Sequence, residues 1–162
     1  MALTRPERVQ ALVVADIAPV AYDHGFDGVI AALGALDLAS LRDRRDADAQ
    51  LSRHLDDPGL RGYLLQNLVK EGSAWRWRID LQALRSSMGA ILGFPDSAGR
   101  QYPGPAFFIY GSDSDYVSGR HLPAIRALFP LARLRSVPGA GHWLYADQPE
   151  AFLRALRGFL GD

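Results

Sequence analysis

The residues best suited to chemistry lie on a glycine-rich turn near the end of the sequence. The turn, Pro138-Gly139-Ala140-Gly141-His142, follows an alternating run at 132–137 that predicts a strand and precedes an amphipathic run at 148–160 that predicts a helix. A histidine at the carboxyl edge of a parallel sheet is well placed to act as a general base. We therefore expect His142 to be catalytic; the alternative is a loop histidine that packs against Trp143.

A histidine base needs a nucleophile, and the sequence contains no Gly-x-Ser-x-Gly turn. The segment Ser86-Ser87-Met88-Gly89 contains a Ser-Met-Gly sequence, but no glycine stands two residues before Ser87 and no strand precedes it. Its spacing from Leu81 is helical instead. We interpret the chain as one half of a hydrolase site.

The elements that must position this site alternate along the chain. Apolar runs at 9–15 and 106–110 predict two strands in addition to the one at 132–137, and a helical run at 122–129 lies between the last two. Such alternation predicts an α/β fold with a parallel sheet and right-handed crossovers.

A long insertion separates the first strand from the second. Residues 22–95 show helical spacing throughout, although 75–79 alternates and is compatible with a short strand or an extended linker. We expect a single partial domain over 1–162 that contains a helical cap insertion at 22–95.

Composition excludes several classes of function. The formal net charge is zero, so nothing indicates nucleic acid, and no apolar run is long enough to span a membrane. The chain has no cysteine and its first residues do not form a signal peptide, which favours a cytoplasmic protein without thiolate metal sites.

The first strand raises a packing problem. Three strands make a small parallel sheet, and the apolar run at 9–15 would present an open edge to other chains. Residues 5–8 read as the tail of a helix that runs into this strand. We expect the chain to be the C-terminal part of a larger domain, with the N-terminal half or a second copy as partner.

Several segments together resemble the α/β-hydrolase superfamily and, within it, the small bacterial esterases of the YbfF type. They cover essentially the whole chain in the same order and spacing: 14–20 (Val-Ala-Asp-Ile-Ala-Pro-Val), 108–117 (Phe-Ile-Tyr-Gly-Ser-Asp-Ser-Asp-Tyr-Val), 129–130 (Phe-Pro), 139–143 (Gly-Ala-Gly-His-Trp) and 147–149 (Asp-Gln-Pro). In that family the nucleophilic serine lies on a turn before the first of these segments. The resemblance implies that this turn precedes Met1.

The acid that orients His142 has two candidate positions. Most of the superfamily carries it in a Gly-x-x-Asp-x-x-Val pattern, whose acid slot here holds Ser114, with Asp113 and Asp115 on either side. In the YbfF-type esterases the acid instead ends the earlier strand, which corresponds to Asp16, and a serine assists from the later slot. The resemblance thus implies Asp16 as the acid and Ser114 as its assistant, with Asp113 as the alternative. The non-catalytic readings are a turn cap for Asp16 and turn formation for Asp113 and Asp115.

The resemblance implies a serine-type hydrolase of small carboxylic esters or thioesters, inactive as this chain alone and needing no metal or organic cofactor. Its oxyanion hole would come from backbone amides outside this chain. Two alternatives stay open: a haloperoxidase, dehalogenase or carbon–carbon hydrolase of the same fold, and a non-catalytic remnant that only binds.

Overall fold

The computed structural model describes residues 1–23 and 26–161. It divides into two compact units, one formed by Met1–Ala21 with Phe94–Asp162 and the other by Tyr22–Gly93. The second unit lies within the expected insertion at 22–95; that it caps a pocket stays a prediction. We describe each unit separately.

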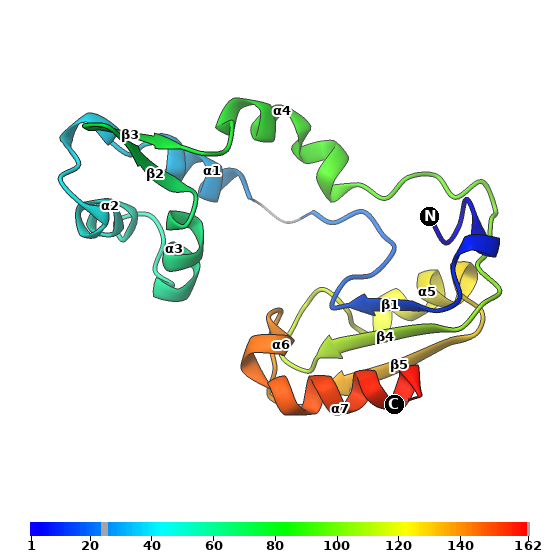
Figure 1. Cartoon of the computed structure of the whole chain (residues 1–162). Coiled ribbons are helices and arrows are strands. Elements are labelled where there is room, and N and C mark those ends of the chain that lie inside the picture. Colours follow the sequence, from blue (N-terminus) through cyan, green and yellow to red (C-terminus); the bar gives the residue numbers. More distant parts are fainter. Residues whose placement is uncertain (24–25, 162) are drawn as a thin grey trace. The chain divides into compact units, whose positions relative to one another are not determined.

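A parallel sheet forms the centre of the first unit (Figure 1). Its strands are β1 (Leu12–Ala15), β4 (Ala106–Gly111) and β5 (Ala132–Val137), in the order β1-β4-β5. The expected α/β fold with about three parallel strands is confirmed. The first strand is shorter than the run at 9–15, because the chain enters it from a 3₁₀ helix, η1 (Pro6–Arg8).

Helices pack on both faces of this sheet. The apolar face of α7 (Pro149–Leu160) contributes Phe152, Ala155 and Phe159 to a cluster with Phe107 and Ile109. On the opposite face Phe108 meets Phe129, which ends α5 (Leu122–Leu128). The alternation of strand side chains puts residues 107 and 109 on one face and 108 on the other. A 3₁₀ helix, η3 (Gly119–His121), precedes α5, and α6 (Leu144–Asp147) precedes α7.

The second unit combines helices with a hairpin. Its helices are α1 (Asp27–Gly34), η2 (Leu38–Ser40), α2 (Arg44–Leu51), α3 (Pro58–Leu65) and α4 (Leu81–Leu92). Strands β2 (Leu68–Glu71) and β3 (Ala74–Trp77) pair in antiparallel fashion. The strand interpretation of the alternating run at 75–79 is therefore right for residues 75–77, and the linker interpretation is wrong there.

The expectation of helical structure throughout 22–95 is wrong at the hairpin. Leu60, Leu64 and Leu68 have helical spacing, but α3 ends at Leu65 and Leu68 begins β2. Gly72 adopts a positive φ of 63°, which turns the chain between the two strands. Leu68 is fully buried in the core of this unit, so burial explains its apolar character without a helix.

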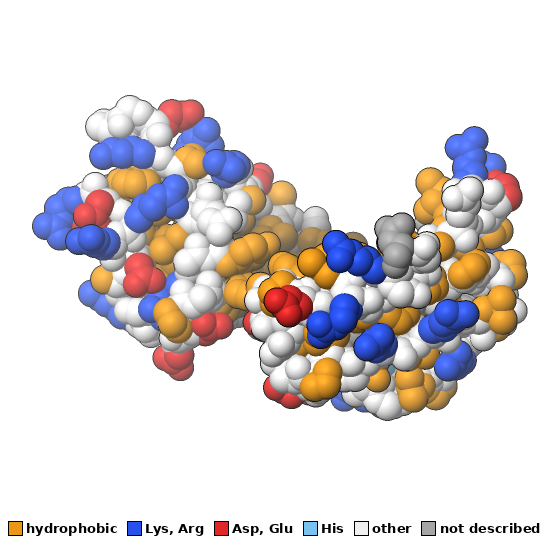
Figure 2. Space-filling model, turned by 60° about the horizontal axis from the view of Figure 1, so that its bottom comes forward, with side chains coloured by type: hydrophobic (Ala, Val, Ile, Leu, Met, Phe, Trp, Pro, Cys, Tyr) orange, Lys and Arg blue, Asp and Glu red, His pale blue; other side chains and the backbone are white. Residues whose placement is uncertain are grey.

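The surface carries charges of both signs. On the face that Figure 2 displays, acidic and basic side chains lie among hydrophobic ones, in keeping with a formal net charge of zero. Among the described residues, no helix combines the length and the apolar character that crossing a membrane requires.

Candidate active site

Three loops meet at the carboxyl edge of the parallel sheet. Asp16 directly follows β1, Ser114 lies in the loop after β4, and His142 lies in the turn between β5 and α6. The strands are aligned so that Ala15 pairs with Ile109 and the ends of β4 and β5 pair with each other. Because parallel strands end at the same edge, side chains distant in sequence converge there.

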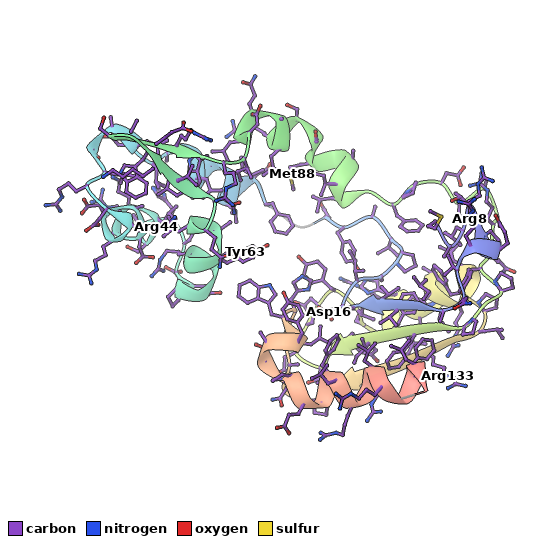
Figure 3. All side chains as sticks on the ribbon, viewed as in Figure 1. Arg8, Asp16, Arg44, Tyr63, Met88 and Arg133 are labelled. Atoms are coloured by element: carbon purple, nitrogen blue, oxygen red, sulfur yellow. The ribbon has the colours of Figure 1, made fainter. Side chains whose placement is uncertain are left out.

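Asp16 is the centre of the site. Its side chain is buried and its carboxylate accepts three hydrogen bonds: Oδ1 from the Gly111 N–H at 3.1 Å, and Oδ2 from Ser114 Oγ at 2.5 Å and from His142 Nδ1 at 2.8 Å. Buried carboxylates need such partners. The backbone of Asp16 has φ 50°, a left-handed conformation that aspartate adopts more readily than most residues. Figure 3 labels Asp16 at the tip of β1.

His142 presents its second ring nitrogen to its surroundings. Its side chain is 47% exposed and Nδ1 is the ring atom that contacts Asp16. With the proton on Nδ1 donated to the carboxylate, Nε2 carries a free electron pair and can accept a proton. The Asp16 carboxylate is placed to stabilise an imidazolium at this position. This pairing of a histidine with a buried carboxylate is the arrangement found in catalytic triads.

A glycine allows the histidine turn to reach the end of β4. A Cβ on Gly111 would overlap the carbonyl oxygens of Ala140 and Gly141. The two backbones continue in contact beyond this point, because the Ser112 N–H donates to Val137 and the Asp113 N–H to Ala140, each at 3.0 Å. Only a residue without a side chain fits here, so glycine at position 111 allows the turn that carries His142 to approach the end of β4.

The structure separates the two candidate acids. Asp113 is exposed, and its Oδ1 accepts a hydrogen bond at 2.8 Å from Ser112 Oγ, which itself accepts from the Gly139 N–H at 2.8 Å. Among the described residues, the carboxylate in ion-pair contact with His142 is that of Asp16. The three expected site residues, Asp16, Ser114 and His142, thus lie together, and Asp113 contributes to the turn instead.

Two further side chains at the site were not expected from the sequence. The Tyr116 ring stacks on the His142 ring, and Asp147 Oδ2 accepts a hydrogen bond at 2.8 Å from the Gly141 N–H. Both residues lie in the segments that carry the family resemblance. Their positions close to Ser114 and His142 in the sequence could have indicated that they lie at the site.

Ser87 and the other described histidines, His54 and His121, belong to other elements. Ser87 is within α4 and not on a strand-to-helix turn. The buried His121 accepts a hydrogen bond from the Ser118 N–H at 3.1 Å and caps η3. His54 is exposed, and His24 lies outside the described residues.

The comparisons with known proteins define the class. Residues 1–155 match the model of the Alpha/beta hydrolase family, and the chain belongs to this family. Among solved structures it is similar to a "Marine microorganism esterase", with a TM-score of 0.89 and 36% identity over 98% of this chain and 63% of that chain.

Particular relatives are named as lipases and esterases. The chain is 39% identical to the mouse (Mus musculus) "sn-1-specific diacylglycerol lipase ABHD11", over 99% of this chain and 54% of that protein. It is 36% identical to "Esterase YbfF" of Escherichia coli (strain K12), over 100% of this chain and 63% of that protein. The expected resemblance to YbfF-type esterases is confirmed. The chain spans about half the length of the ABHD11 relatives that it matches.

Proposed function

We propose that this chain supplies the base and acid of a serine-type carboxylic-ester hydrolase. One observation carries the proposal: His142 Nδ1 lies 2.8 Å from the buried Asp16 carboxylate, which leaves Nε2 as the proton acceptor. The names of the relatives, an esterase and a diacylglycerol lipase, support ester bonds as the substrate class. Thioesters of small acyl groups are a second expected substrate.

In the proposed reaction His142 transfers one proton in each of two half-reactions, the serine proton in the first and a water proton in the second. Nε2 takes the proton from a serine hydroxyl as its oxygen attacks the acyl carbonyl, then gives it to the leaving alcohol, and an acyl-enzyme remains. Water then attacks the acyl-enzyme with the same base, releasing the carboxylic acid and restoring the serine. Asp16 holds the imidazole in the required tautomer, and Ser114 orients that carboxylate through its hydrogen bond to Oδ2.

The proposal places the nucleophile and the oxyanion hole outside this sequence. No serine of the chain stands in a Gly-x-Ser-x-Gly turn. The matched relatives are longer than the region of similarity, so they have room for both features. A metal ion or organic cofactor has no role in this reaction scheme.

A chimera tests the proposal. The chain would replace the matching segment of the Escherichia coli esterase YbfF, and the product would be assayed with short p-nitrophenyl esters and a fluorophosphonate probe. We expect ester hydrolysis and probe labelling, and we expect His142→Ala to abolish turnover while the chimera stays folded. Removal of the general base commonly costs at least ~10²-fold in rate.

The matched controls separate the alternatives. The 162-residue chain alone should hydrolyse no ester above the rate of its own His142→Ala variant. A folded chimera without esterase activity would favour the binding remnant, and turnover of haloalkanes or carbon–carbon substrates in its place would favour the other enzyme classes of the fold. Activity that survives His142→Ala would refute the proposed base.

A further inference from the structure

The Tyr116 side chain covers one face of the His142 imidazole. The ring centroids of Tyr116 and His142 are 4.1 Å apart and their planes differ by 25°, which is a stacked contact. Stacking at this distance contributes beyond the area that it buries. The contact belongs to the first unit and lies beside the hydrogen bond between His142 and Asp16.

The loop that carries Tyr116 is held at several points. Ser114 Oγ donates to Asp16 and accepts a hydrogen bond at 3.3 Å from the Tyr116 N–H. The next residue, Val117, is buried, and Ser118 begins the capped turn at η3. The Tyr116 ring is therefore presented by a fixed backbone that also carries the serine bound to the acid.

The hydrogen bond to Asp16 alone would not fix the orientation of the His142 ring. The His142 side chain is about half exposed, and its ring is hydrogen-bonded to Asp16 through Nδ1. A ring held at one nitrogen can still swing about that bond, which would move Nε2 away from a reacting hydroxyl. An aromatic face against the imidazole opposes this movement.

We propose that Tyr116 is a positioning residue, whose ring face keeps the imidazole aligned with the Asp16 carboxylate and supports its protonated form. The inference rests on the proposed role of His142 as the base. It assigns the Ser114–Tyr116 segment two tasks, because Ser114 orients the acid and Tyr116 orients the base. Contact between an aromatic face and a cation is favourable, so the ring helps most when His142 holds the proton.

The ionisation of Tyr116 agrees with this assignment. Burial, and then the negative charge of Asp16, raise the pKa of the Tyr116 phenol above its ordinary value. The phenol therefore stays neutral at neutral pH, and the stacked ring adds no negative charge that would compete with Asp16. The expected effect depends on the ring face and not on the hydroxyl, so phenylalanine should replace tyrosine.

Nuclear magnetic resonance of the histidine ring tests the inference without any catalytic assay. In the wild-type chain labelled with ¹⁵N-histidine, the carbon-bound ring protons of His142 should be shifted upfield by the Tyr116 ring. In Tyr116→Leu that shift should disappear, and the Nδ1 proton should exchange with water roughly two- to fivefold faster, the range that aromatic–cation contacts at exposed sites imply. Tyr116→Phe should retain both wild-type signatures.

Tyr145→Leu is the matched control, because Tyr145 is an exposed tyrosine of α6 whose ring contacts Phe152. It should leave the His142 signals unchanged. If the His142 ring protons of the wild-type chain showed no upfield shift, the inference would be overturned. This test does not depend on whether Tyr116→Leu folds. A folded Tyr116→Leu with wild-type exchange would also overturn the inference, as would a Tyr116→Phe that behaves like Tyr116→Leu.

The chimera adds a kinetic reading. There Tyr116→Leu should lower kcat and leave KM unchanged, whereas Tyr116→Phe should match the parent chimera. An inactive parent would count against the proposed function alone, because the imidazole signals would still decide the role of Tyr116. A lower kcat in Tyr116→Phe as well would contradict the ring-face explanation.

Discussion

Asp16 combines a buried carboxylate, a left-handed backbone and three hydrogen-bond donors. In the chimera, Asp16→Asn should lower kcat by about 10³- to 10⁴-fold, because an amide can donate to Nδ1 and favour the tautomer whose Nε2 already carries a proton. Asp113→Asn is the matched control and should stay near the parent rate, since Asp113 contacts the Ser112 hydroxyl. Ser114→Ala should cost less than Asp16→Asn. Steady-state kinetics would contradict this assignment if Asp113→Asn were the inactive variant.

At the scale of the elements, the junction between the end of β4 and the turn after β5 determines the site. Gly111→Ala would force its Cβ against the Ala140 and Gly141 carbonyls and should destabilise the chain by about 1–3 kcal/mol, the range for overpacked sites. Gly158→Ala in α7 is the control, because its Cβ would meet no atom within 4 Å and alanine favours a helix. Urea unfolding measures both free energies. Equal urea midpoints for Gly111→Ala and wild type would contradict this prediction, because they would show that the junction accommodates a methyl group without loss of stability.

At the scale of the whole molecule, β1 has an open side. Among the described residues it pairs with β4 and with no other strand, and an unpaired apolar edge recruits other chains. We expect the 162-residue chain to self-associate with increasing concentration in analytical ultracentrifugation. Ala15→Lys, at an exposed position of β1, should weaken this association because a charged edge resists pairing. A wild-type chain that stays monomeric over the whole concentration range would contradict the expectation. The N-terminal half as a partner remains a prediction of the same kind.

Local pattern alone was enough to predict much of this protein. The apolar run at 106–110 predicted β4, because a strand covered by helices on both faces is apolar over most of its length. The alternating run at 132–137 predicted β5. The glycine-rich turn predicted the place of His142 for a similar reason, since it follows one strand and precedes a helix. Pattern failed at Leu68, whose helical spacing to Leu64 reflected burial in a shared core and not a common helix.

The partners of His142 depended on the tertiary structure. Asp16 and His142 are separated by 126 residues. The family resemblance implied Asp16, but local pattern does not show which carboxylate the strand register brings to the imidazole. Asp113 and Asp115 flank the expected acid slot in the chain, yet the stacked Tyr116 and the buried Asp16 are the side chains that reach the ring. Strands, helices and turns can be predicted from sequence because they depend mostly on residues that are close together in the chain. Contacts between loops of different strands are decided only when the sheet and its turns have formed.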